Sequence, residues 1–157
     1  MRRTDREVTN EADIRAILDR AQVLHLAMID EDRPYVVPLH YGYTLQDGRL
    51  TLYLHSAREG RKLDVLDRND QVAFVLETDV SPISGGDLPC RYGAAYASVM
   101  GEGRAVLLSD PAKKASALQI LMGTQTGRTF AVTEAMTGSV TVIRVDVEAF
   151  TAKARRV

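Results

Sequence analysis

The segment LYLHSAREGRKLD, at residues 52–64, gathers the charged and polar groups best suited to hold an anion. Ser56 and Glu59 have the spacing of a capping box, which predicts a helix over about residues 57–67. Three cations then fall on one face of its opening turns: Arg58, Arg61 and Lys62. Each is disfavoured there by roughly 0.3–1 kcal/mol, because a helix N-terminus carries a partial positive charge.

This arrangement of cations has two interpretations. Free N–H groups, the helix dipole and basic side chains together make a site that binds phosphate, which would satisfy the cations when it is bound. The same residues also fit a solvated basic face, with Glu59 and Asp64 compensating for part of the charge. The pattern alone leaves both interpretations open, because short motifs have a real false-positive rate.

The remaining candidate groups point to no other chemistry. His25, His40 and His55 fall on three different predicted strands without a neighbouring ligand at metal-site spacing, so no metal site is expected. His55 precedes the basic turn and is the histidine best placed to line a site, its alternative role being a half-buried residue bonded to backbone. Cys90 has no local partner for catalysis. The sequence contains no G-x-S-x-G elbow, P-loop or strand-borne G-x-G-x-x-G motif.

Four tyrosines fall on neighbouring predicted strands: Tyr35, Tyr41, Tyr43 and Tyr53. They could stack on a flat aromatic ligand, or they could serve only as good packing on a pleated surface. The residue types do not decide between these roles.

Length and composition predict one globular domain over residues 1–157, with 45% hydrophobic residues and a formal net charge of −1. With this net charge, no nucleic acid or membrane partner is expected, so any anion site must be local. No apolar run suits a membrane span, and MRRTDREVTNEADI lacks the apolar segment of a secretory signal. The single cysteine excludes an internal disulfide and favours a reducing, cytoplasmic location.

The hydrophobic pattern predicts a mainly β fold. Six strands are expected, at residues 22–30, 34–45, 49–55, 71–80, 95–108 and 139–150. Helices are expected at about 10–20, 57–67, 110–122 and 131–136. Short turns and the lack of βαβ alternation favour an antiparallel β-barrel with peripheral helices. Gly101 and Gly103 suggest a bulge or bend, and residues 81–93 have the composition of a loop that could serve as a lid.

Four segments, taken in order, resemble a known family. They are PYVVPLHYGY, LYLHSAREGRKLD, YASVMGEGRAV and the D-P-x-x-K helix start at Asp110. Together they resemble the pyridoxamine 5′-phosphate oxidase-related flavin-binding split barrels, and within these the nitroimidazole-resistance branch, which the opening MRRTDREVTN also resembles. The combination of V-P-L-x-Y-x-Y and H-S-A-x-x-G-x-K is fairly specific, and the resemblance covers nearly the whole chain.

The resemblance implies a six-stranded antiparallel FMN-binding split barrel that forms a two-fold homodimer, with a flavin in each groove between the subunits. By matching positions, it implies four residues beside the isoalloxazine ring: Val37, Pro38, Leu39 and Tyr41. Around the ribityl–phosphate chain it implies His55, Ser56 and Ala57. At the phosphate itself it implies Gly60, Arg61 and Lys62. Ser98 and Val99 would face the flavin of the partner subunit.

The implied activity is that of a flavin-dependent oxidoreductase that reduces small electron-poor compounds such as nitroaromatics. His55 is the candidate catalytic residue, placing or protonating a substrate. Vitamin B6 oxidation is not expected, because FTAKARRV lacks the substrate-handling residues that those oxidases carry near their C-terminus. A non-enzymatic flavin module that acts as a store, sensor or electron carrier remains an alternative. FAD, deazaflavin or haem in place of FMN also remains open.

Overall fold

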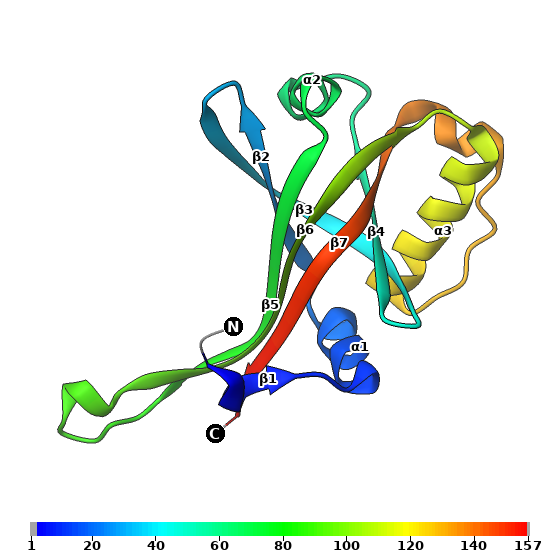
Figure 1. The fold of residues 1–157 in the computed structure, drawn as a ribbon. Coiled ribbons are helices and arrows are strands. Elements are labelled where there is room, and N and C mark those ends of the chain that lie inside the picture. The colour runs from blue at the N-terminus through cyan, green and yellow to red at the C-terminus, as the bar shows by residue number, and fades with distance from the viewer. Residues whose placement is uncertain (1–2, 157) are drawn as a thin grey trace.

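Six long strands close into an antiparallel barrel in the computed structural model, which describes residues 3–156 (Figure 1). The strands are β2 (Val23–Asp30), β3 (Arg33–Gln46), β4 (Arg49–Ser56), β5 (Gln71–Ile83), β6 (Gly93–Leu108) and β7 (Thr141–Arg155). The sheet order is β1-β7-β4-β3-β2-β5-β6, and pairing of β6 with β7 closes the ring. The predicted β-barrel is confirmed. The predicted strand count is one too low, because the short strand β1 (Glu7–Val8) adds to β7.

The barrel interior is filled by the alternate apolar residues of each strand. In β4, Leu50, Leu52 and Leu54 point inward and are almost completely buried, as the alternation predicts. They pack in one core with residues of every other long strand, among them Leu24, Leu26, Tyr41, Leu76, Val99 and Ile143.

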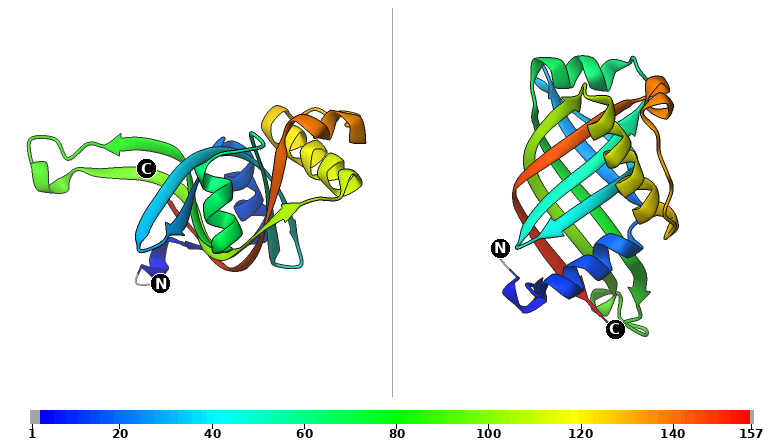
Figure 2. Two further views of the ribbon diagram at one scale, coloured as in Figure 1. Left: turned by 90° about the horizontal axis from the view of Figure 1, so that it is seen from above. Right: turned by 90° about the vertical axis from the view of Figure 1, so that its right-hand side faces the viewer.

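Three helices surround the barrel: α1 (Glu11–Arg20), α2 (Arg61–Arg68) and α3 (Pro111–Thr126). Helices α1 and α2 lie at opposite ends of the barrel, and α3 lies along the outside of β3 and β4 (Figures 1 and 2). The predicted starts of α1 and α3 are confirmed, because Asn10 and Asp110 each accept hydrogen bonds from two backbone N–H groups of the first turn. Three short 3-10 turns complete the fold: η1 (Thr4–Arg6), η2 (Pro89–Arg91) and η3 (Glu134–Ser139).

The predicted start of α2 is wrong. Ser56 is the last residue of β4, pairs with Thr141 of β7 and is buried, so its hydroxyl does not cap a helix. The chain turns first, and α2 begins at Arg61 after Gly60, which makes no side-chain cap. The strand pairing with β7 therefore overrides the local capping-box pattern.

Helix α3 approaches β3 more closely than any side chain at the crossing point would allow. A β-carbon at Gly42 would lie 2.5 Å from the backbone nitrogen of Leu121 and 2.8 Å from the carbonyl carbon of Ile120. The helix ends at Thr126, later than predicted, because Gly127 rather than Gly123 adopts the left-handed conformation that ends it.

Residues 81–93 are only partly the loop that their composition predicts. The strands β5 and β6 continue pairing out to Ile83 and Gly93, which leaves 84–92 as the connection. The resulting two-stranded ribbon projects away from the barrel, at the end opposite α2 (Figures 1 and 2). The predicted bend in β6 is confirmed by a register shift against β7 between Glu102 and Gly103.

Candidate functional site

The barrel is split where β3 and β4 separate. Strand β4 pairs with residues 41–46 of β3, whereas residues 33–40 pair only with β2. Between residues 3 and 156, the structure has no strand on the second edge of 33–40. Backbone N–H and C=O groups on that edge are therefore free to hydrogen-bond a ligand.

The turn between β4 and α2 lies at the same end of the barrel as this open edge. Gly60 has φ +138°, a conformation that residues with a side chain rarely adopt, and nothing lies within 4 Å of the position a β-carbon would take. The N–H groups of Arg61 and Lys62 follow it and have no acceptor within the helix, whereas the N–H of Leu63 donates to the carbonyl oxygen of Gly60 at 2.8 Å. The turn thus offers bare backbone donors beside open space.

Lys62 lies on the first turn of α2 and reaches back to the end of β4. Its ammonium group donates a hydrogen bond of 2.8 Å to the hydroxyl oxygen of Ser56. An ammonium group has three donors, so two remain for a ligand. The two residues are brought together although the helix does not begin where the capping box predicts.

Arg61 is engaged with the β2–β3 hairpin. Its Nε donates to a carboxylate oxygen of Asp30 at 2.8 Å, and Arg68 donates to the other oxygen at 2.6 Å. The guanidinium carbon of Arg61 also lies 4.4 Å from the centre of the Tyr35 ring, within cation–π range. Asp30 therefore holds α2 against the end of β2, a contact that sequence spacing gave no reason to expect.

Asp30→Asn is expected to lower the melting temperature at pH 7, with the difference from wild type shrinking in acid. The hydrogen bond from Arg61 holds the pKa of Asp30 below its usual value, and the bond from Arg68 adds to this. A carboxyl group whose pKa is lower in the folded than in the unfolded state stabilises the fold at pH values above its unfolded-state pKa of about 4. This stabilisation is lost as the pH falls through the folded-state pKa. Thermal unfolding between pH 7 and pH 3 measures both effects.

The control for this prediction is Asp32→Asn, because the Asp32 side chain is 88% exposed and its nearest cation, Arg33, is 3.8 Å away. We expect that substitution to leave the melting temperature nearly unchanged. An Asp30→Asn deficit of the same size at pH 7 and pH 3 would contradict the electrostatic role.

His55 is the last of the β4 residues whose side chains point outward from the barrel, and it is half-buried. Its Nδ1 is buried and makes no hydrogen bond within residues 3–156. Burial lowers the pKa of the imidazole below its usual value, and repulsion from His40 and Lys62 lowers it further. His55 is therefore a neutral imidazole near pH 7.

The other predicted site residues fall on different faces. On β3, Val37 and Leu39 pack partly against the core, Pro38 is exposed, and the Tyr41 side chain is completely buried. Ala57 is exposed in the turn before Gly60. Ser98 and Val99 lie on β6, which pairs with β5 and β7, so the chain does not bring them beside β3.

Two of the four tyrosines, Tyr41 and Tyr43, are used in packing. The hydroxyl of Tyr41 donates to the carbonyl oxygens of Leu18 and Ala21 at 2.7 and 3.1 Å. Tyr43 donates to the carboxylate of Asp19 at 2.7 Å, and burial raises the pKa of both phenols well above the usual value. Both therefore anchor α1 to the barrel, which favours the packing role.

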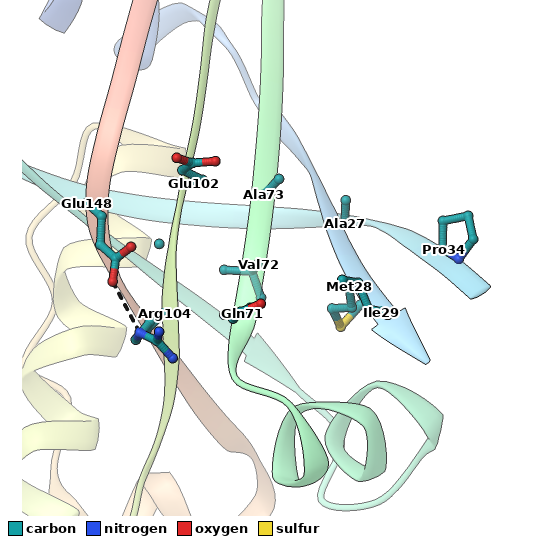
Figure 3. A pocket seen from close by; sticks show the side chains of 11 residues that line it. Ala27, Met28, Ile29, Pro34, Gln71, Val72, Ala73, Glu102, Arg104 and Glu148 are labelled. Carbon is teal, nitrogen blue, oxygen red and sulfur yellow. Dashed lines mark hydrogen bonds and ion pairs between the residues drawn. The ribbon is translucent and has the colours of Figure 1, made fainter. Parts of the chain in front are cut away.

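Another candidate surface is the outer face of β2, β3, β5 and β6. Several large apolar side chains are exposed there: Val23, Ile29, Val36 and Met100. A cavity of about 450 Å³ on this side is lined by Ile29, and the ion pair of Arg104 with Glu148 at 3.2 Å borders it (Figure 3). None of the predicted flavin-binding residues lines this cavity.

No three His, Cys, Asp or Glu side chains among residues 3–156 are grouped to hold a metal ion. In that same range no helix has both the length and the apolar character needed to cross a membrane.

Comparison with known proteins identifies the family. The model of the pyridoxamine 5′-phosphate oxidase family matches residues 10–154. The chain belongs to this family. The resemblance predicted from the four sequence segments is thus confirmed. No curated protein sequence gives a significant match.

Solved structures of similar proteins share the fold. A candidate 5-nitroimidazole antibiotic resistance protein from Bacteroides thetaiotaomicron is 30% identical, with a TM-score of 0.78 over 94% of this chain and 86% of that chain. The flavocytochrome Anf3 from Azotobacter vinelandii is 20% identical, with a TM-score of 0.77 over 100% of this chain and 72% of that chain. A FAD- and haem-binding protein from Mycobacterium smegmatis is 15% identical, with a TM-score of 0.76 over 97% of this chain and 74% of that chain.

Proposed function

We propose that this family member binds a flavin nucleotide, FMN or FAD, and uses it to reduce small electron-poor molecules such as nitroaromatics. The observation that carries the proposal is the β4–α2 turn, where Lys62 and the first amides of α2 surround the open space at Gly60. Basic side chains and free helix N–H groups together suit a phosphoryl group.

The residues of the turn fit such a group on two grounds. The glycine conformation leaves the backbone bare, so an anion can approach the amides without displacing a side chain. Lys62 is already oriented by Ser56, which reduces the entropy cost of holding a phosphate. Arg61 is committed to Asp30, and its proposed role at the phosphate is therefore electrostatic.

The ring of the flavin is proposed to lie along the open edge of β3, with backbone groups of residues 37–40 at its polar edge and Pro38 against its face. A bound flavin supplies the hydride or electrons for reduction. His55 is proposed to orient a substrate by hydrogen bonding as a neutral imidazole, because its pKa is lowered. Ala57 would border the ribityl chain.

A homodimer is part of the proposal. The exposed apolar face that includes Ile29, Val36 and Met100 has the character of an association surface. A two-fold axis through this face would make both copies equivalent. Ser98 and Val99 would then serve the flavin of the partner subunit, and a reducing cytoplasmic location accords with the single exposed cysteine, Cys90.

The comparisons support the proposal that this chain binds a flavin. Experiment decides which flavin it is. Two similar structures are of a flavocytochrome and a FAD- and haem-binding protein, and a third is of a candidate nitroimidazole-resistance protein. Nitroimidazoles are electron-poor nitroaromatic compounds, which is the class of substrate proposed here.

The test is an absorbance spectrum of the purified protein, followed by mass measurement of the released cofactor. We expect flavin bands at about one flavin per chain, bleaching by a nicotinamide cofactor, and reoxidation by a nitroaromatic compound under anaerobic conditions. The mass distinguishes FMN, FAD and deazaflavin, and a Soret band would indicate haem.

Two results would overturn parts of the proposal. A protein that binds neither FMN nor FAD would refute flavin binding. A stably bound flavin that a nitroaromatic compound fails to reoxidise would favour the non-enzymatic binding module.

A further inference from the structure

A hydrogen-bonded cluster joins α3 to β3 at the point where the barrel splits. Nδ1 of His40 lies 3.0 Å from the carbonyl oxygen of Gln22 and 3.0 Å from Oε1 of Gln125. The amide nitrogen of Gln125 donates to the carbonyl oxygen of Tyr41 at 2.7 Å. That donation fixes the orientation of the Gln125 amide, so its oxygen faces His40 as an acceptor.

The cluster determines which nitrogen of His40 carries the proton. Both neighbours of Nδ1 are acceptors, so Nδ1 must be the protonated nitrogen. In the neutral ring, Nε2 is then a free acceptor. The side chain is exposed, and Nε2 has no hydrogen bond to any residue in the described range 3–156. His40 therefore presents a lone pair in a defined direction without an evident structural use.

His40 lies beside the proposed ligand site. The last paired residues before the split are Tyr41 and Leu54, so the next positions, His40 and His55, are not paired with each other but both lie on the outer surface. His40 is near enough to His55 to contribute to the lowered pKa of that imidazole. His40 is also the last residue of the open edge of β3, two positions from the exposed Pro38. His40 thus lies at the end of the open edge, where a flat ring on that edge would end.

We propose that Nε2 of His40 accepts a hydrogen bond from the ring imide N–H of the bound flavin, and that Gln125 is the positioning residue that holds His40 for this contact. The inference rests on the proposed flavin function and deepens it. Oxidised isoalloxazine has one ring N–H, at N3, and the lone pair of His40 is complementary to it. This contact is separate from the phosphate contacts of Lys62, so the two can be tested independently.

The experiment compares the dissociation constants of three flavins, FMN, N3-methyl-FMN and riboflavin, measured by fluorescence titration of flavin-free protein. In wild type, N3-methylation is expected to weaken binding about tenfold, the effect of losing one hydrogen bond. In His40→Leu that difference should disappear, while the preference for FMN over riboflavin should persist. Lys62→Met should show the reverse pattern, losing the phosphate preference and keeping the N3 preference.

Gln125→Glu tests the positioning role. A carboxylate beside Nδ1 stabilises the imidazolium form, which turns Nε2 of His40 from an acceptor into a donor. We expect the N3 preference to vanish in this variant although His40 is present. The ¹⁵N chemical shifts of His40 should report the Nδ1–H tautomer of the neutral ring in wild type, and Gln125→Glu should keep the doubly protonated ring to a higher pH than wild type does.

Failure of this inference is distinguishable from failure of the proposed function. A wild-type protein that binds no flavin refutes both. If wild type binds FMN but methylation costs the same in wild type and in His40→Leu, the contact with His40 is refuted and flavin binding stands. Equal protonation of the two nitrogens in the neutral ring of wild-type His40 would refute the assigned tautomer and, with it, the contact.

Discussion

Lys62→Met is expected to weaken FMN binding by about 10- to 100-fold, the effect of losing a charge-assisted hydrogen bond worth roughly 1.5–3 kcal/mol. Affinity for riboflavin, which lacks the phosphate, should change little. The reason is the position of the Lys62 ammonium group, held 2.8 Å from the Ser56 hydroxyl at the entrance of α2. Titration of both flavins with flavin-free protein measures the effect.

The control is Lys113→Met, which removes an exposed cation of the same type from the first turn of α3. It tests whether any loss at Lys62 reflects only the change in net charge. Ser56 is buried and loses its Lys62 partner in the variant, so the melting temperature must be compared as well. Equal weakening of FMN and riboflavin binding would contradict a phosphate contact, and so would unchanged binding of both.

Gly42→Ala is expected to lower the free energy of unfolding by about 1–3 kcal/mol, the usual cost of overpacking a well-packed contact. The added methyl group would meet the backbone of α3 at Ile120 and Leu121, and a backbone segment cannot move aside as the end of a flexible side chain can. The helix must therefore shift as a unit. Chemical denaturation of the variant and wild type measures the loss.

The matched control is Gly138→Ala, because nothing lies within 4 Å of a β-carbon at that position. We expect it to be close to neutral. Displacement of α3 in Gly42→Ala should also move Gln125 away from His40, which the ¹⁵N shifts of His40 would report. Equal stability of the two variants would contradict the close packing of α3 against β3.

The sequence by itself determined the features that depend on neighbouring residues. The alternation of Leu50, Leu52 and Leu54 predicted which face of β4 is buried, because side chains of a strand point alternately to its two faces. Asn10 and Asp110 predicted the starts of α1 and α3, because a cap bonds N–H groups only two or three residues away.

Only the tertiary structure decided the features that depend on distant pairing. Ser56 has the local pattern of a helix cap, but its pairing with Thr141 of β7 keeps it in a strand. Asp30 meets Arg61 and Arg68, 31 and 38 residues later, and His40 meets Gln125, 85 residues later. Such contacts follow from how the strands and helices pack, so the spacing of residues along the chain gives no sign of them.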